Sequence, residues 1–306
     1  MMVLLEFDGL LDRQMRMTQI ILMASFAVAA LAGCSPRRAV ELLLVGDHFD
    51  LTPHVAYGAD PRQRLDVYRP RGGARLAPVV LFLYGGRWQT GSKEQYRLLG
   101  DALTREGVVA VIPDYRLYPA AHFPAWMEDG ARAVRWARDN IARYGGDPGR
   151  IFVVGHSAGA HTALLLALDK RYLGAAGVAP GVVRGFVGLA GPVATTWTDP
   201  DVQALMGPPA GWPATYPLTH ATGAAPPLLL LHGRRDRTVA PDNALRLAAR
   251  VRERGGCVRT VLYRGLDHVG IVIALSVPKL GIAPVVEDLM AFVRDPRVAC
   301  RGGGGR

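Results

Sequence analysis

The sequence is poor in the residues that mark metal-binding and nucleic-acid-binding proteins. Its three cysteines, Cys34, Cys257 and Cys300, show no C-x-x-C or other metal-ligand spacing. Lysine accounts for only 3 of the 36 basic residues, and no run of five basic residues accompanies the formal net charge of +10. Because the arginines are scattered and no aromatic residues alternate with them, we expect neither a metal site nor a nucleic-acid partner.

The sequence also lacks an apolar run of about 20 residues, the length that a membrane-spanning helix needs. The run at residues 20–33 follows Arg16 and has only 14 residues, which is typical of the hydrophobic region of a secretion signal. It ends in Leu31-Ala32-Gly33-Cys34, which resembles the lipobox of bacterial lipoproteins. In those proteins the peptide before the cysteine is removed and the thiol is acylated. We therefore expect residues 1–34 to be a lipoprotein signal peptide and Cys34 to be a membrane anchor.

The first residues of the chain do not fit this signal. Three acidic residues give residues 1–14 the wrong charge for the basic start of a signal peptide. We therefore predict a true start at Met15 or Met17; the alternative is an uncleaved apolar N-terminus with an unrelated cysteine. A cleaved signal predicts a bacterial envelope protein facing the periplasm or the exterior, where Cys257 and Cys300 are free to pair.

The chain is long and apolar enough for one domain with a sizeable core. Of its 306 residues, 50% are hydrophobic and 20% are charged, which excludes a disordered polymer. We expect a tether at residues 35–54, a single domain at 55–295 and a flexible tail at 296–306. Repeated prolines interrupt residues 192–227, and a segment of this length without regular structure is typical of a functional loop or lid.

Short apolar runs alternate with longer patterns of helical period along this domain. The apolar runs indicate strands buried on both faces, and the intervening patterns indicate helices on both sides of a mostly parallel sheet. The sequence therefore predicts an α/β fold. The expected strands are Leu65–Tyr68, Val79–Tyr84, Val108–Ile112, Ile151–Val154, Phe186–Leu189, Leu228–Leu231 and Val258–Tyr263, and the expected helices are Gln95–Glu106, Trp126–Tyr144, Ala160–Leu168, Ala240–Arg254 and Pro284–Val293.

One pentapeptide has the pattern of a nucleophilic serine. Gly155-His156-Ser157-Ala158-Gly159 follows an expected strand and precedes an expected helix. In this G-x-S-x-G pattern the glycines permit a sharp turn that raises the serine hydroxyl above the sheet edge. The N–H of Ala158 and the start of the helix then face the place where negative charge develops on a carbonyl oxygen. We expect Ser157 to be a nucleophile; the alternative is a glycine-rich structural turn.

A serine nucleophile needs a histidine that accepts its proton and a carboxylate that orients the histidine. Where a serine occupies such a strand–turn–helix, the acid and then the histidine follow it along the chain. Asp236 comes shortly after the expected strand at 228–231, and His268 comes after the strand at 258–263. Ligands gather past the carboxyl ends of parallel strands, so we predict a triad of Ser157, Asp236 and His268.

Four other histidines and one other acid compete for these roles. None of these histidines combines the right chain order with a position just after a strand, so we expect them to be structural. The acid adjoins His268 in sequence, and adjacent residues seldom face each other across an imidazole ring. The rejected candidates are His156, His161, His220, His232 and Asp267.

A second group of backbone donors is expected beside the serine. The strand at 79–84 ends in Tyr84-Gly85-Gly86, and a glycine pair lets N–H groups approach a carbonyl oxygen closely. We predict an oxyanion hole formed by the backbone N–H groups of Gly85, Gly86 and Ala158.

Further short motifs accompany the predicted triad in a fixed order. They are LDVYRP at 65–70, GGRW at 85–88 with GSK at 91–93, DYRL at 114–117, FP at 123–124, GHSAG at 155–159, the acid loop at 232–239 and Asp267-His268. With these motifs the chain resembles the α/β-hydrolases of the esterase and lipase group, which includes hormone-sensitive-lipase-like and feruloyl-esterase-like enzymes. The resemblance covers residues 55–295 and implies an α/β-hydrolase fold, carboxylic-ester hydrolysis and no metal or cofactor.

Two positions depart from the pattern of these enzymes. They usually have His-Gly-Gly where this chain has Tyr84-Gly85-Gly86, and Arg234 replaces the first Asp of their His-Gly-Asp-x-Asp acid loop. The hydrogen bond that steadies the glycine loop must therefore come from the Tyr84 phenol or be absent. We expect Asp114-Tyr115-Arg116 to be a structural ion-pair and turn element.

The resemblance and the predicted triad together indicate a serine hydrolase. We expect it to cleave small carboxylic esters of short to medium acyl chain through an acyl-enzyme. A serine at the turn, in place of an aspartate, argues against dehalogenase and epoxide-hydrolase chemistry on the same fold. Two alternatives stay open: an amidase similar to arylformamidases, and a catalytically silent envelope lipoprotein. The sequence does not predict the number of subunits.

Overall fold

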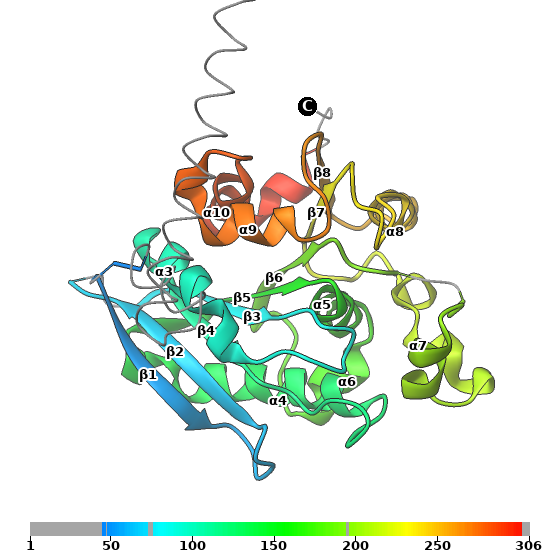
Figure 1. Cartoon of the computed structure of the whole chain (residues 1–306), viewed down its shortest axis with the longest axis horizontal. Helices are drawn as coiled ribbons and strands as arrows, with labels where there is room; N and C mark the ends of the chain where they lie inside the picture. The colour runs from blue at the N-terminus through cyan, green and yellow to red at the C-terminus, as the bar shows by residue number, and fades with distance from the viewer. Residues whose placement is uncertain (1–44, 47, 73–75, 194–195, 302–306) are drawn as a thin grey trace, which may run out of the picture. The chain divides into compact units, whose positions relative to one another are not determined.

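The computed structural model describes residues 45–46, 48–72, 76–193 and 196–301, so the predicted signal peptide and Cys34 lie outside the described residues. The chain divides into two compact units, Met1–Asp47 and His48–Arg306, and every element below belongs to the second. Its described residues form a sheet of eight strands in the order β1-β2-β4-β3-β5-β6-β7-β8 (Figure 1). The strands are β1 (Phe49–Ala56), β2 (Arg64–Pro70), β3 (Ala77–Leu83), β4 (Val109–Pro113), β5 (Gly146–His156), β6 (Val183–Leu189), β7 (Leu228–Gly233) and β8 (Val258–Tyr263).

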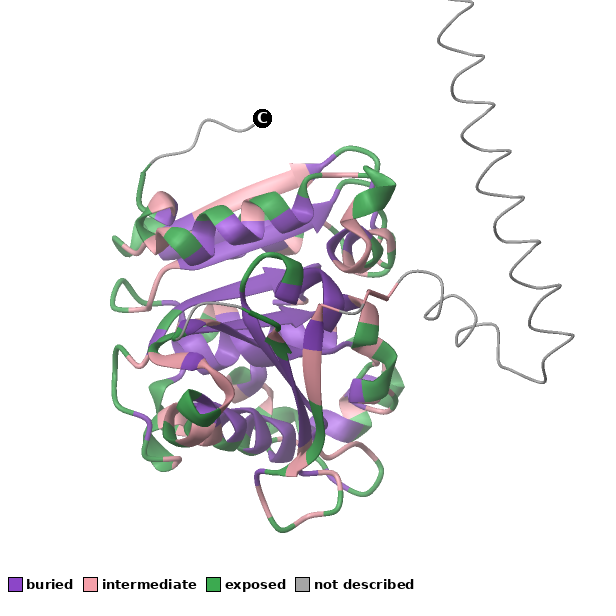
Figure 2. Ribbon diagram, turned by 90° about the vertical axis from the view of Figure 1, so that its left-hand side faces the viewer, coloured by how far each residue is buried: buried purple, intermediate pink, exposed green. Residues whose placement is uncertain are grey.

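Most of the sheet is parallel and buried. β1 pairs with β2, and β2 with β4, in antiparallel register, whereas the pairs from β4 to β8 are parallel. β3, β4 and β7 are buried almost throughout (Figure 2). Their continuous Val, Leu and Ile runs suit this position because helices cover both faces. The predicted α/β fold with a mostly parallel sheet is confirmed.

Helices cover the two faces of the sheet (Figure 1). On one face α9 (Gly270–Ser276) packs against α3 (Arg97–Arg105) and α10 (Val285–Arg294). On the other face α4 (Ala125–Asn140) packs against α5 (Ala158–Leu168) and α6 (Lys170–Ala175), while α8 (Asp242–Glu253) packs on β7 and β8. Every residue of α5 is buried because this helix lies between the sheet and α4, and its sequence is accordingly apolar except for His161 and Thr162.

The domain begins before the expected residue 55. β1 is hydrogen-bonded to β2, so the tether predicted at 35–54 is too long at its C-terminal end. This strand has a weak sequence pattern because it lies at the sheet edge, contains Pro53 and shifts register between Thr52 and Val55.

The segment 192–227 contains more regular structure than predicted. It forms α7 (Pro200–Met206) and two short 3₁₀ helices, η3 (Pro209–Thr215) and η4 (Pro217–His220). Each helix begins with a proline, where the missing N–H costs no intrahelical hydrogen bond, and the Asp199 side chain caps α7. Three of the prolines that interrupt the sequence pattern, Pro200, Pro209 and Pro217, therefore start helices in the structure.

The C-terminal end is also more ordered than the predicted tail at 296–306. Pro296–Ala299 forms a 3₁₀ helix, η6, which Asp295 caps through its side chain. Cys300 forms a disulfide with Cys257, which attaches the chain end to the loop before β8. Residues 302–306 lie outside the described residues. Among the described helices, none has the length and apolar character needed to cross a membrane.

Candidate active site

Ser157 occupies a sharp turn between β5 and α5. Its φ of +54° and ψ of −119° lie outside the common regions for L-residues. The turn requires glycine on both sides, because a Cβ on Gly155 would lie 2.1 Å from the Gly159 carbonyl oxygen and a Cβ on Gly159 would lie 2.0 Å from the Leu83 carbonyl oxygen. The close packing fixes Ser157, which is half-buried, at the carboxyl edge of the sheet.

His268 lies between the other two residues predicted for the triad. Its Nε2 is 2.9 Å from Ser157 Oγ, and its Nδ1 is 2.8 Å from Asp236 Oδ2. The side chain of Asp236 is 0% exposed and that of His268 is 13% exposed. β5, β7 and β8 lie in one parallel sheet, so the loops after their carboxyl ends meet and bring the three side chains together.

Donors from its own loop hold Asp236 in place. Its Oδ1 accepts hydrogen bonds from the backbone N–H groups of Thr238 at 2.9 Å and Val239 at 2.8 Å. His232 Nε2 lies 2.8 Å from the Val239 carbonyl oxygen and 3.3 Å from Asp236 Oδ2. Burial lowers the pKa of His232, so this imidazole is neutral at pH 7 and donates from Nε2. These contacts orient the carboxylate toward His268.

The glycine pair predicted for the oxyanion hole lies against the nucleophile. A Cβ on Gly85 would lie 2.9 Å from Ser157 Cβ, so no other residue fits there without movement. Gly86 has a φ of +127°, and a Cβ on it would lie 2.2 Å from the Thr90 carbonyl oxygen. Ala158 is the first residue of α5, where backbone N–H groups have no partner within the helix. Gly85 and Ala158 therefore adjoin Ser157, and Gly86 follows Gly85 in the same loop.

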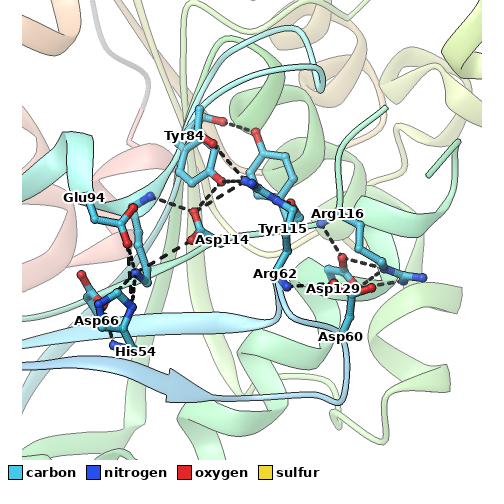
Figure 3. Close-up of polar contacts among 12 residues, drawn as sticks. His54, Asp60, Arg62, Asp66, Tyr84, Glu94, Asp114, Tyr115, Arg116 and Asp129 are labelled. Carbon is cyan, nitrogen blue, oxygen red and sulfur yellow. Dashed lines mark hydrogen bonds and ion pairs between the residues drawn. The ribbon is translucent and has the colours of Figure 1, made fainter. Parts of the chain in front are cut away.

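The Tyr84 phenol makes the hydrogen bond whose source the sequence left open. Tyr84 Oη donates to Asp114 Oδ1 at 2.7 Å and accepts from Arg62 at 2.9 Å (Figure 3). Burial raises the pKa of Tyr84, so the hydroxyl keeps its proton and donates it. The second departure, Arg234, is exposed, and its backbone N–H donates to the Tyr263 carbonyl oxygen at 2.8 Å.

Several other candidates have structural surroundings. His161 is buried and donates from Nε2 to a backbone carbonyl of η3 at 2.7 Å, and burial lowers its pKa to about 4. Asp267 is exposed, and its carboxylate accepts from the Gly270 N–H at 2.7 Å. Arg116 forms an ion pair of 2.8 Å with the buried Asp129, in agreement with the structural role expected for its motif.

His156, which the sequence predicts to be structural, lies against His268 and the glycine loop. Its Nε2–H donates to the His268 carbonyl oxygen at 2.9 Å, and the two rings lie 4.9 Å apart. A Cβ on Gly85 would lie 3.0 Å from His156 Nδ1, so the imidazole also borders the glycine loop. Burial lowers the pKa of His156 to about 4, which keeps it neutral beside the imidazole of His268. His156 therefore contacts the candidate site although its chain order excludes it from the triad.

Two family profiles match this chain. The prolyl oligopeptidase family matches residues 127–295, a range that includes Ser157, Asp236 and His268. The family described as BD-FAE matches residues 65–176, which include the glycine loop and the serine turn.

Several curated relatives that match over most of this chain are named as esterases. The chain is 30% identical over 281 residues to Esterase LipQ of Mycobacterium tuberculosis, which covers 82% of this chain and 65% of the relative. It is 26% identical over 277 residues to the probable isoprenylcysteine alpha-carbonyl methylesterase ICMEL1 of Arabidopsis thaliana, which covers 81% of this chain and 58% of the relative. The chain thus spans less than two thirds of the length of these relatives.

Solved structures share the fold at low sequence identity. Esterase B from Lactobacillus rhamnosis superposes with a TM-score of 0.70 at 19% identity, over 94% of this chain and 96% of that chain. A truncated carbohydrate esterase from gut microbiota superposes with a TM-score of 0.70 at 18% identity, over 83% of this chain and 99% of that chain. At these identities the similarity establishes the fold.

Proposed function

This chain belongs to the prolyl oligopeptidase family of α/β-hydrolases, and on that premise we propose that it hydrolyses carboxylic esters with Ser157, His268 and Asp236 as its catalytic triad. The observation that carries the proposal is the hydrogen-bond chain from Asp236 Oδ2 through His268 to Ser157 Oγ, with distances of 2.8 and 2.9 Å. The names of the relatives support esters, in preference to peptides, as the substrates.

Acylation begins when Ser157 Oγ attacks the ester carbonyl carbon and His268 Nε2 takes the hydroxyl proton. Asp236 stabilises the resulting imidazolium through its hydrogen bond with Nδ1–H. The tetrahedral intermediate then collapses, and His268 gives the proton to the leaving alcohol as the ester C–O bond breaks. The acyl group stays on Ser157 Oγ.

Backbone N–H groups stabilise the negative oxygen of that intermediate. We assign this role to the N–H groups of Gly85, Gly86 and Ala158.

Deacylation repeats these steps with water as the nucleophile. His268 Nε2 takes a proton from the water as its oxygen attacks the acyl carbon, and the same N–H groups stabilise the second intermediate. His268 then returns the proton to Ser157 Oγ, which releases the carboxylic acid. The products are one acid and one alcohol, and the enzyme returns to its starting state.

Short to medium acyl chains are the proposed substrate range. The structural neighbour esterase B is inhibited by a tributyrin phosphonate, which supports a butyryl-sized group. The purified full chain should be assayed on p-nitrophenyl esters from acetate to laurate, an aryl formamide and a prolyl p-nitroanilide peptide. We expect kcat/KM to peak between acetate and octanoate and to exceed the value for the anilide by about 100-fold or more.

Each other result of this panel identifies a different activity. A higher kcat/KM on the aryl formamide would indicate an amidase, and a higher value on the prolyl peptide would indicate a peptidase. If the wild type is faster than Ser157→Ala on none of these substrates, the chain is a catalytically silent lipoprotein.

We also propose that Cys34 anchors the protein in the bacterial cell envelope, facing the periplasm or the exterior. The Leu31-Ala32-Gly33-Cys34 sequence supports acylation at this position. The Cys257–Cys300 disulfide supports an oxidising compartment, because disulfides are rare in the cytosol.

Labelled palmitate tests the anchor in bacteria that process lipoproteins. The wild type should carry the label, whereas Cys34→Ala should lose it. Cys300→Ser removes a cysteine of the disulfide instead and should keep the label. Equal labelling of the wild type and Cys34→Ala would rule out this anchor.

A further inference from the structure

The Asp114 carboxylate is hydrogen-bonded to the residues at both ends of the loop that carries the glycine pair. Asp114 Oδ1 accepts a hydrogen bond from the Tyr84 phenol at 2.7 Å and another from the backbone N–H of Lys93 at 2.8 Å (Figure 3). Tyr84 immediately precedes residues 85–92, and Lys93 immediately follows them. A single oxygen atom therefore fixes the two ends of this loop relative to each other.

Arg62 makes a second connection across the same loop. Its Nη2 donates to Tyr84 Oη and to the Gly91 carbonyl oxygen, each at 2.9 Å. Its Nε donates to the Tyr115 carbonyl oxygen at 2.8 Å, and Nη2 lies 3.7 Å from Asp114 Oδ1. One rigid guanidinium thus joins both ends of the loop to the chain segment that follows β4.

The ring and the carbonyl group of Tyr84 are fixed as well. The ring stacks on Tyr115 and Tyr96, with centroids 4.6 and 5.5 Å apart, and a Cβ on Gly91 would lie 2.7 Å from it. Tyr115 Oη donates to the Tyr84 carbonyl oxygen at 2.7 Å. That carbonyl and the Gly85 N–H belong to one planar peptide group, so this bond also sets the direction of the Gly85 N–H.

The buried Lys93 ammonium lies near the Asp114 carboxylate. The Lys93 side chain is only 1% exposed, and its Nζ lies 3.9 Å from Asp114 Oδ2, 3.3 Å from Asp66 Oδ1 and 2.9 Å from His54 Nδ1. Burial raises the pKa of Asp114, whereas the hydrogen bonds from Tyr84 and from the Lys93 N–H act against that rise. The Arg62 charge also acts against the rise in the Asp114 pKa, and a charged carboxylate makes the stronger hydrogen bonds.

We propose that Tyr84 and Asp114 are positioning residues for ester hydrolysis: with Arg62 and the Lys93 N–H they form a clasp that holds Gly85 and Gly86 beside Ser157. The inference rests on the proposed function. The clasp acts through the loop backbone, because an oxyanion donor must lie within about 2.7–3.1 Å of the charged oxygen. A purely structural clasp would lower stability and leave the chemical step unchanged.

Tyr84→Phe tests the clasp because it keeps the ring and removes only the hydroxyl. We expect kcat on p-nitrophenyl butyrate to fall about tenfold with KM unchanged within twofold, since the loss acts on the transition state. Asp114→Asn keeps an acceptor oxygen and removes the charge, so its kcat should fall less. The rate of Ser157 phosphonylation should fall in proportion to kcat, because the phosphonyl oxygen needs the same donors.

Tyr263→Phe is the matched control. Tyr263 is a buried tyrosine on β8 whose hydroxyl donates to Asp288 Oδ2 at 2.8 Å, so the substitution removes the same kind of bond without touching the loop. Urea unfolding of each variant measures the loss of stability. If Tyr84→Phe loses stability like Tyr263→Phe and keeps wild-type kcat and phosphonylation, the clasp is only structural and the inference is wrong. If the wild type hydrolyses no ester, the proposed function fails instead.

Discussion

Replacing Ser157 by alanine is expected to lower kcat on p-nitrophenyl butyrate by about 10⁵–10⁶-fold. The substitution removes Ser157 Oγ, the atom that forms the acyl-enzyme bond and lies 2.9 Å from His268 Nε2 in the wild type. His268 then has no hydroxyl proton to accept. The residual rate comes from the backbone donors and from substrate binding, which the variant keeps. Steady-state kinetics measure kcat, and urea unfolding measures the free energy of unfolding. Stability should be almost unchanged, because alanine meets the same backbone strain as serine at this turn.

Ser276→Ala is the matched control in a chain with only five serines. Ser276 is half-buried at the end of α9, and its loss should leave kcat unchanged. A fluorophosphonate should modify the wild type and Ser276→Ala once, at Ser157, and should not modify Ser157→Ala, as measured by mass spectrometry. Modification of Ser157→Ala, or a kcat within tenfold of the wild type, would show that Ser157 is not the nucleophile.

The central strands are predictable from the sequence because burial on both faces leaves a short apolar run with no competing pattern. β8 runs over Val258–Tyr263, the range that the sequence predicts. β1 is not predictable in this way, since an edge strand is partly exposed and Pro53 interrupts its pattern. Period-based arguments treat every proline as a break, so they also miss α7, in which Pro200 is the first residue.

Sheet topology predicts the triad of the candidate site, whereas the contacts around Tyr84 depend on side-chain packing. Positions just after parallel strands meet at one edge of a sheet. Chain order and these positions select His268, and the separation of the acid from His268 in sequence favours Asp236 over Asp267. No such rule relates Arg62, Tyr84 and Asp114, which are 22 and 30 residues apart along the chain. Their contacts exist because β2, β3 and β4 lie in one sheet with β4 between the other two. The Tyr84 phenol therefore could be named from the sequence, but its partner could not.

Asp236→Asn is expected to lower kcat by about 10⁴-fold while KM and the fold are preserved. Asp236 Oδ1 accepts from the N–H groups of Thr238 and Val239, and an amide oxygen is able to replace it there. The amide NH₂ group then faces His268 Nδ1. A donor at that position favours the tautomer with its proton on Nε2, which cannot accept the proton of Ser157. Steady-state kinetics of the wild type and the variant from pH 6 to pH 10 measure the loss.

Asp267→Asn separates this tautomer effect from a simple loss of charge near the imidazole. Asp267 adjoins His268 in sequence, but it is exposed and its carboxylate accepts from the Gly270 N–H at 2.7 Å. Because solvent screens an exposed charge, we expect Asp267→Asn to keep kcat within about threefold of the wild type. Ser–acid–His order holds for either carboxylate, so chain order does not choose between them. A larger loss in Asp267→Asn than in Asp236→Asn would transfer the acid role to Asp267, whereas the expected reverse order assigns it to the buried carboxylate.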